Sequence, residues 1–339
     1  MMSSSAPLDE TRPSAHFAAM PLRRRLPALV GAVLLPATGS AQLGFQARAI
    51  RLIVPVAPGG SQDIVARLLA RHMAEPLGQP IIVENKPGAA GNIGLEIVAR
   101  ARPDGLTMGA GSDNLSINKA LFPWLAFDPV EDFAAVAQAT LVPQMLVVRT
   151  DSPFTGLASF LDAAGRQPLA MGSGGNGSLA HLLQHMLQGL TGRHWTHVPY
   201  RGGAPALNDL LAGSLHAMMG NVGAVAGAVA AGLVRGLAIS SDRRAQALPQ
   251  VPSFNELGLP QATILGWHGL VAPRDTPAGI VALLHAAALH AIRQPVMRER
   301  LAAIGITPSE APPAELAERM RADAQRWVAL ARRGGLGVE

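Results

Sequence analysis

The chain has 339 residues, of which 49% are hydrophobic and 15% charged, with a formal net charge of +5. This composition supplies a large apolar core, argues against disorder over most of the length, and allows two domains of ordinary size. No cysteine is present, which excludes disulfides, thiolate nucleophiles and cysteine metal sites.

Residues 20–42, MPLRRRLPALVGAVLLPATGSAQ, have the organisation of a secretory signal. Three arginines precede an apolar stretch that is too short to span a bilayer. The small residues that follow predict cleavage after Ala41, with a twin-arginine signal as the alternative. We therefore expect 1–41 to be an N-terminal extension and signal peptide, with the natural start at Met20 or Met1.

Basic residues are scattered beyond the expected cleavage site. No run rich in lysine or arginine follows residue 41. The positive charge therefore does not form a basic face, and nucleic acid is not expected as a partner.

Short apolar runs alternate with amphipathic segments along the rest of the chain. Strands are expected at 51–56, 80–84, 106–110, 144–149, 168–171, 196–199, 215–219, 235–240 and 267–272. Helices are expected at 62–76, 92–101, 114–121, 155–164, 177–189, 204–212, 223–231, 277–292, 295–303 and 313–333. This alternation, punctuated by glycine and proline, predicts an α/β fold with mainly parallel sheets flanked by helices.

Two lobes are expected instead of one large sheet. We place the crossings between them near 144–149 and 265–270. Lobe 1 would then comprise 42–145 with 266–339, and lobe 2 would comprise 146–265.

The segment VPVAPGGSQD, residues 54–63, joins a predicted strand to a predicted helix through two glycines. Glycine lets a ligand approach the backbone closely, and the first turn of a helix exposes N–H groups without intrahelical partners. Because the helix dipole adds partial positive charge there, the turn predicts an anion site that needs no lysine or arginine. The alternative is a tight turn in which Ser61 or Asp63 caps the helix.

Two further glycine-rich turns have a similar construction. LAMGSGGNGSLAHLLQHM, residues 169–186, runs from a strand through four glycines into a helix, and HVPYRGGAPALNDLL, residues 197–211, contains the only tyrosine. A tyrosine over a small polar ligand would offer an apolar face and one hydroxyl, although packing at the end of a sheet explains it equally well. Neither the turn at 58–63 nor the one at 172–177 has the GxGxxG spacing or a Walker lysine, so no nucleotide cofactor is expected.

His181 and His185 stand four residues apart on the helix after the second turn, a spacing that suits zinc. The motif HLLQH lacks the glutamate of HExxH and no third ligand is evident, so no metal site is expected. A Ser-His-Asp set can be drawn among the many serines and histidines, but no GxSxG elbow occurs. Structural roles are assigned to His194, His197, His216 and His268.

Eight stretches occur in the order found in a known family. They are VPVAPGGSQDIVARLLA, GQPIIVENKPGAAGNIG, RPDGLTM, FDPVEDFAAVA, GSGGNGSLAHL, VPYRGGAPALNDLLAG, LAISSDRRAQALPQVPSFNELGLP and WHGLVAPRDTPAGIV. Together they resemble the Bug family of extracytoplasmic solute receptors, the substrate-binding proteins of tripartite tricarboxylate transporters. The resemblance covers essentially the whole chain after the signal. It implies a periplasmic binding protein of the type II fold, with two α/β lobes, two linking strands and a cleft between the lobes.

Family ligands are usually small carboxylates, including di- and tricarboxylates, amino acids and aromatic acids. The resemblance implies that backbone N–H groups and waters of the loop after the first strand hold the carboxylate, with the second and third turns on the opposite lobe. Carried onto this sequence, these positions are Ala57, Pro58, Gly59, Gly60, Asp63, Ser173, Gly174, Asn176, Gly177, Ser178, Tyr200, Arg201 and Gly202.

The sequence departs from the family pattern after the stretch LHAMM. Gly220 stands where an aspartate is usual, and the next residue, Asn221, completes the expected ligand-binding set. Gly223 and Gly227 replace prolines in the following helix. Because an acidic partner for an ammonium group is missing, the sequence favours a ligand without an amino group.

Three functions fit these observations. The first is a monomeric, non-enzymatic periplasmic receptor that delivers a small carboxylate to a transporter's membrane subunits or to a sensor, without a cofactor. The second is a secreted hydrolase that uses His181 or another histidine. The third is an effector-binding module similar to the regulatory half of a LysR-type regulator, which the signal sequence and the missing helix-turn-helix disfavour.

Overall fold

The structure, a computed structural model, describes residues 48–334. The expected signal peptide and the cleavage site after Ala41 lie outside these residues. The strands are β1 (Ile50–Val54), β2 (Ile81–Asn85), β3 (Thr107–Ser112), β4 (Phe133–Arg149), β5 (Ala170–Ser173), β6 (Thr196–Pro199), β7 (Ala217–Asn221), β8 (Val234–Ile239), β9 (Leu265–Pro273) and β10 (Thr307–Pro308). The helices are α2 (Ser61–Leu77), α3 (Asn92–Ala99), α4 (Asn114–Leu121), α5 (Leu157–Ala164), α6 (Leu179–Thr191), α7 (Gly203–Leu211), α8 (Val222–Ala230), α9 (Ala278–Arg293), α10 (Pro295–Ala303) and α11 (Pro313–Gly334), with short 3₁₀ turns at η1 (Ala89–Gly91) and η2 (Pro260–Ala262).

The strands form a mixed sheet in the order β2-β1-β3-β9-β4-β7-β5-β6, with β8 and β10 paired to β4. The strands β1, β2 and β3 are parallel to one another, as are β5, β6 and β7. Every pairing made by β4 and β9 is antiparallel. The expected α/β class is confirmed. The sheet is mixed instead of mainly parallel, because β4 and β9, which connect its two halves, also pair within the sheet.

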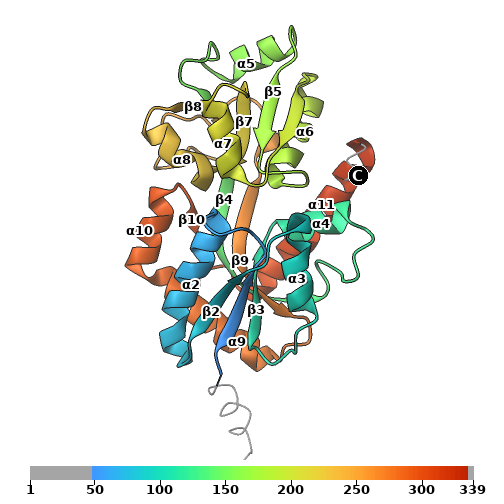
Figure 1. The fold of residues 1–339 in the computed structure, drawn as a ribbon, viewed down its shortest axis with the longest axis vertical. Coiled ribbons are helices and arrows are strands. Elements are labelled where there is room, and N and C mark those ends of the chain that lie inside the picture. Colours follow the sequence, from blue (N-terminus) through green and yellow to red (C-terminus); the bar gives the residue numbers. More distant parts are fainter. Residues whose placement is uncertain (1–47, 335–339) are drawn as a thin grey trace, which may run out of the picture. The chain divides into compact units, whose positions relative to one another are not determined.

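The strand β4 carries the chain from one half of the sheet to the other (Figure 1). Up to Pro143 it pairs with β9, and from Gln144 onward it pairs with β7 and β8. Only its second part, 144–149, is predicted from the sequence. The first part is rich in alanine, which has a low strand propensity, so its pairing with β9 decides its conformation.

Alternate residues of β1 enter two different cores. Leu52 packs with Leu69 and Met73 of α2, whereas Ile53 packs in a second core with Leu95 of α3. The side chains of a strand point to opposite faces in turn, so α2 and α3 cover opposite faces of the sheet. Burial of each such side chain stabilises the fold by roughly 1.5–3 kcal/mol. This packing fixes the start of α2 beside the carboxyl end of β1.

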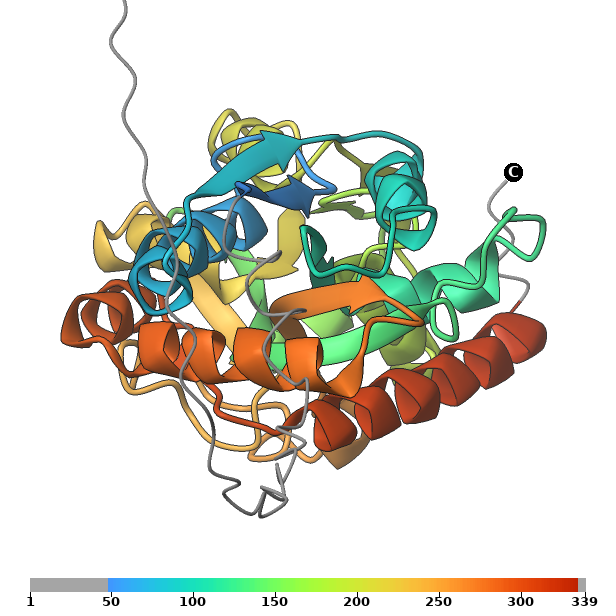
Figure 2. The same cartoon turned by 90° about the horizontal axis from the view of Figure 1, so that it is seen from below.

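The C-terminal helix α11 connects two cores. Leu316 and Met320 belong to the core that contains Trp267, and Trp327 belongs to a core with Leu146 and other residues of the second half of the sheet. In Figure 2 this helix is the long red one that runs along one side of the molecule.

Between residues 48 and 334, no single helix combines the length and apolar character needed to cross a bilayer. The helices α9 and α10 meet this test only when taken together, and they are bent by 67° at the break between them.

Candidate functional site

Among the helices that follow a parallel strand, four carry the expected binding residues at their starts. The helix α2 follows β1, and α6, α7 and α8 follow β5, β6 and β7 (Figure 1). Ligands of open α/β sheets bind outside the carboxyl ends of the strands, where the first turns of helices present unpaired N–H groups. The candidate site is therefore assembled from these four turns.

The turn between β1 and α2 is held by Asp63, a residue that is only 2% exposed. Its carboxylate accepts hydrogen bonds from the backbone N–H of Gly59 at 2.9 Å, from Nε of Arg67 at 2.9 Å and from Nδ2 of Asn85 at 2.8 Å. Burial alone would raise the pKa of Asp63, but these hydrogen bonds outweigh it and lower the pKa. Asp63 is thus an ionised brace that shapes the loop from inside.

This bracing changes which amides are available in the first turn. The N-cap of α2 is Gly60, so the alternative in which Ser61 or Asp63 caps the helix is wrong. The N–H of Gly59 is engaged by Asp63. The N–H groups of Ser61, Gln62 and Asp63 have no hydrogen-bond partner within residues 48–334. Ala57, Pro58, Gly59 and Gly60 are exposed, as a binding loop requires.

The turn between β5 and α6 is organised by two serines. Ser173 is fully buried; its Oγ accepts from the N–H of Gly175 at 3.1 Å and pairs with Nε2 of His197 at 2.7 Å. Ser178 caps α6 by accepting from the N–H of His181 at 3.2 Å, and it donates to the carbonyl of Gly175 at 2.8 Å. Both hydroxyls therefore shape the turn, while the side chain of Asn176 is exposed.

His181 and His197 stack with ring centroids 4.0 Å apart and an interplanar angle of 13°. Burial, with the neighbouring His181, lowers the pKa of His197 to about 4, and burial also lowers the pKa of His181. Both rings are therefore neutral near pH 7. No group of three or more side chains able to hold a metal ion occurs among the described residues. The Ser173–His197 pair offers no nucleophile to a substrate because Ser173 has no exposed surface.

The loop between β6 and α7 packs directly on this second turn. A β-carbon placed on Gly175 would lie 3.0 Å from the carbonyl oxygen of Tyr200. The Tyr200 hydroxyl donates to Oδ2 of Asp209 at 2.6 Å, and this hydrogen bond, together with burial, raises the pKa of Tyr200 to about 12. The hydroxyl is thus already engaged, which leaves the ring and backbone of the loop to face a ligand. Arg201 is exposed, and Gly202 adopts a φ of +116° that favours glycine.

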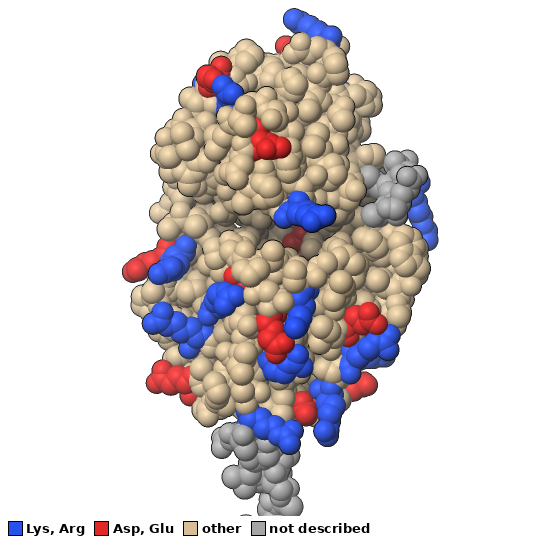
Figure 3. Space-filling model, viewed as in Figure 1, with Lys and Arg blue, Asp and Glu red and all other residues tan. Residues whose placement is uncertain are grey.

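The starts of α7, α8 and α2 lie side by side. A β-carbon on Gly203 would be 2.9 Å from Cβ of Ala224, and one on Gly223 would be 3.3 Å from Cβ of Ser61. Asn221 is the N-cap of α8, with Oδ1 accepting from the N–H of Ala224 at 3.0 Å. In Figure 3 the surface is hollowed between the elements around α2 and those around α7.

A second set of contacts joins the start of α6 to the first half of the molecule. A β-carbon on Gly177 would lie 3.0 Å from Cδ1 of Leu121 in α4, and one on Gly266 in β9 would lie 3.1 Å from Cδ2 of Leu179. The expected residues of both lobes are therefore brought together around one region.

Sequence reasoning missed His268 of β9. This residue is 7% exposed, and its Nε2 lies 3.0 Å from Oγ of Ser61 at the start of α2. Burial lowers the pKa of His268 to about 4, so the ring is neutral. The only hint in the sequence is a polar residue inside an apolar strand, because the contact joins residues 207 positions apart.

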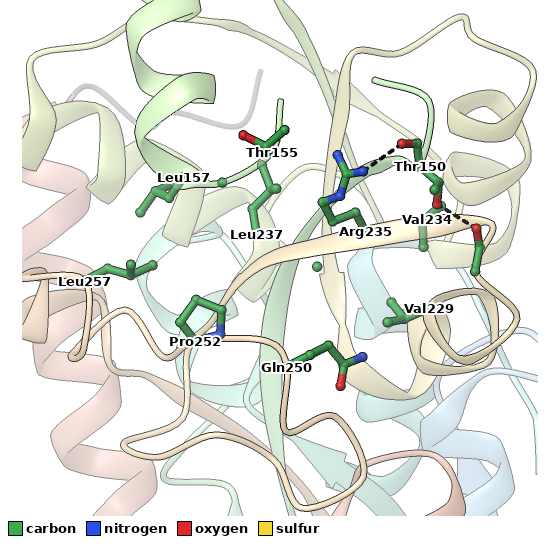
Figure 4. A pocket seen from close by; sticks show the side chains of 13 residues that line it. Thr150, Thr155, Leu157, Val229, Val234, Arg235, Leu237, Gln250, Pro252 and Leu257 are labelled. Atoms are coloured by element: carbon green, nitrogen blue, oxygen red, sulfur yellow. Dashed lines mark hydrogen bonds between the residues drawn. The ribbon is translucent and has the colours of Figure 1, made fainter. Parts of the chain in front are cut away.

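A separate cavity of about 380 Å³ lies at the far end of β4 (Figure 4). It is lined by Leu157, Leu237 and Leu257 among others, and by Arg235. The guanidinium of Arg235 donates to the carbonyls of Thr150 at 2.9 Å and of Phe154 at 3.0 Å. The guanidinium of Arg235 is thus already hydrogen-bonded to backbone carbonyls. This cavity is therefore a poorer anion site than the converging helix starts.

Comparison with known proteins places the chain among solute receptors. Residues 65–336 match the model of the tripartite tricarboxylate transporter family receptor. The periplasmic binding protein BugD is 29% identical with a TM-score of 0.79, covering 86% of this chain and 99% of BugD. MatC from Rhodopseudomonas palustris, solved with bound malate, is 35% identical with a TM-score of 0.77, covering 84% and 99% of the two chains. The R. palustris protein Rpa4515, solved with adipate, is 32% identical with a TM-score of 0.80, covering 85% and 98%. The expected two-lobed periplasmic binding protein fold is confirmed.

Proposed function

Because the chain belongs to the receptor family of tripartite tricarboxylate transporters, we propose that it is a periplasmic receptor that captures a small carboxylate. Relatives solved with malate and with adipate support a ligand with two carboxylates. The receptor acts without catalysis, as a monomer, and passes its ligand to the transporter's membrane subunits or to a sensor.

The observation that carries this proposal is the meeting of the starts of α2 and α8 at Ser61 and Gly223. Each helix start carries roughly half a positive charge from the helix dipole, so two of them in contact repel each other. An anion between or beside them relieves that repulsion and accepts hydrogen bonds from the unpaired amides. The proposed lobes, 42–145 with 266–339 and 146–265, each contribute one of these helices, and the change of pairing at Gln144 supports this division.

The expected binding residues take different roles within the proposed site. Ligand contact is proposed for two groups of residues. The exposed ones are Ala57, Pro58, Gly59, Gly60, Asn176 and Arg201, and the others are the partly buried Gly174, Tyr200 and Gly202 and the buried Gly177. Asp63, Ser173, Ser178 and Asn221 support the turns through the hydrogen bonds that they already make.

Amide binding suits a receptor that must release its ligand. Each hydrogen bond to a charged carboxylate contributes roughly 1.5–3 kcal/mol net. Two or three of them, offset by lobe closure and loss of ligand freedom, are compatible with micromolar affinity, about 8 kcal/mol. The ligand stabilises the closed state only through contacts with both lobes at once.

A thermal melting panel tests the proposal. The protein, expressed with its own signal sequence and purified from the periplasm, is melted with malate, adipate, citrate, amino acids, sugars and divalent cations. A dicarboxylate at 100 times its dissociation constant should stabilise the fold by about 2.7 kcal/mol. Shifts with sugars or cations but with no carboxylic acid would overturn the proposal.

A further inference from the structure

His268 and Ser61 form a hydrogen-bonded pair at the start of α2. Oγ of Ser61 lies 3.0 Å from Nε2 of His268, and the residues described contain no other hydrogen-bond partner for that hydroxyl. The other ring nitrogen, Nδ1, is buried and makes no well-aligned hydrogen bond among the same residues, although a backbone contact with Trp267 raises the pKa of the ring against the larger effect of burial. Ser61 is half-buried and belongs to the turn whose N–H groups are unpaired.

The buried Nδ1 determines where the proton of the neutral ring resides. A proton on Nδ1 would leave a buried N–H donor without a well-aligned acceptor, an arrangement that is rarer among backbone groups than an under-used acceptor. The proton therefore belongs on Nε2, from which it is donated to Oγ of Ser61. The O–H of Ser61 is then left to donate elsewhere.

We propose that Ser61 is a ligand-binding residue whose hydroxyl donates to a carboxylate oxygen, and that His268 is the positioning residue that turns the hydroxyl toward it. This inference rests on the proposed function. The Ser61 hydroxyl adds one side-chain donor to the three unpaired amides of the same helix turn. This donor is neutral, so it places no positively charged side chain beside the carboxylate. The donor reaches the ligand from the side of Gly223, where α8 approaches Ser61.

Isothermal titration with malate and adipate tests the pair in the full mature protein. Ser61→Ala removes a hydrogen bond to a charged group and should raise the dissociation constant about tenfold or more. His268→Gln places an amide N–H near the position of Nε2 and should retain most of the affinity. His268→Asn, whose shorter amide cannot reach Ser61, should bind as weakly as Ser61→Ala, and combining the two should add little further loss.

The outcomes separate the inference from the proposed function. Binding of neither acid, nor of any other carboxylate, by the wild-type protein overturns both. Binding by the wild type with an unchanged dissociation constant in Ser61→Ala overturns the inference alone. Equal losses in His268→Gln and His268→Asn also overturn it, because they indicate a packing role.

A measurement on the wild-type protein covers the case in which variants fail to fold. The ¹⁵N chemical shifts of the His268 ring identify which nitrogen carries the proton. Protonation at Nε2, with and without malate, agrees with the inference, and protonation at Nδ1 overturns it.

Discussion

Ser61 and Gly223 lie against each other although 162 positions separate them, so that a β-carbon on Gly223 would be 3.3 Å from Cβ of Ser61. The same β-carbon would be 3.1 Å from Cδ1 of Ile306. Contacts this short leave no room for a larger side chain. The absence of a side chain at Gly223 is therefore what allows α8 to approach α2.

Gly223→Val should weaken carboxylate binding. Overpacking of this kind should destabilise the state in which α2 and α8 are in contact by about 1–3 kcal/mol. We expect the dissociation constant for malate to rise roughly 5- to 150-fold, measured by isothermal titration. Gly227→Val is the matched control in the same helix, because a β-carbon on Gly227 meets nothing within 4 Å. Equal affinity in the two variants would contradict the closure contact.

Asp63→Ala should destabilise the protein and weaken binding together. It removes the acceptor for the N–H of Gly59 and for the side chains of Arg67 and Asn85. Loss of these partners is expected to lower the free energy of unfolding by about 1–3 kcal/mol, measured by urea denaturation. Glu96→Gln serves as control, since its ion pair with Arg100 is exposed and contributes about 0.5 kcal/mol or less. Similar losses in both variants would argue against a bracing role for Asp63.

Titration of His268 should contribute to the pH dependence of the free energy of unfolding. Its pKa is about 4 in the folded protein against about 6.5 in an unfolded chain, so between these values only the unfolded chain binds the proton. The neutral ring therefore favours the folded state fully above pH 6.5, and this contribution is lost as the pH falls toward 4. His268→Gln should make the fall in unfolding free energy between pH 6.5 and 4.5 shallower by up to about 1.4 kcal/mol per pH unit.

Asp113 provides a control of opposite sign. Burial raises the pKa of its carboxyl to about 6, so between pH 3.8 and 6 the folded protein holds a proton that the unfolded chain lacks. Its contribution to stability is present at low pH and is lost as the pH rises through 6. Asp113→Asn should therefore steepen the loss of stability on acidification, measured by denaturation at each pH. A change of the same sign in His268→Gln and Asp113→Asn would refute the assignment.

The single tyrosine of the chain makes the Tyr200–Asp209 hydrogen bond directly observable. Phenolate absorbance reports only Tyr200, and its titration midpoint should be near 12. Asp209→Asn removes the charged acceptor and should move the midpoint toward 10, the ordinary value for tyrosine. A wild-type midpoint near 10 would mean that the hydroxyl does not donate to Asp209 in solution.

Local sequence patterns were sufficient to predict most of the helices and strands. The apolar period of 62–76 predicted α2, and the glycine-rich turns after 51–56, 168–171 and 196–199 marked three of the four helix starts that meet. These signals are local because helix periodicity, strand alternation and turn chemistry depend on neighbours a few residues apart. The first part of β4 was missed because its alanine-rich sequence favours a strand only when β9 lies beside it.

Local patterns in the chain are enough to show that strands lead through glycine-rich turns into helices, and hence that amides at helix starts are available for an anion. Which amides these are depends on the folded arrangement, because Asp63 engages the N–H of Gly59 and leaves those further along the turn unpaired. Folding also brings Ser61 into contact with both His268 and Gly223, which are more than 160 positions away. Such contacts arise when sheet order and helix packing bring distant segments together, and no local period in a chain encodes them.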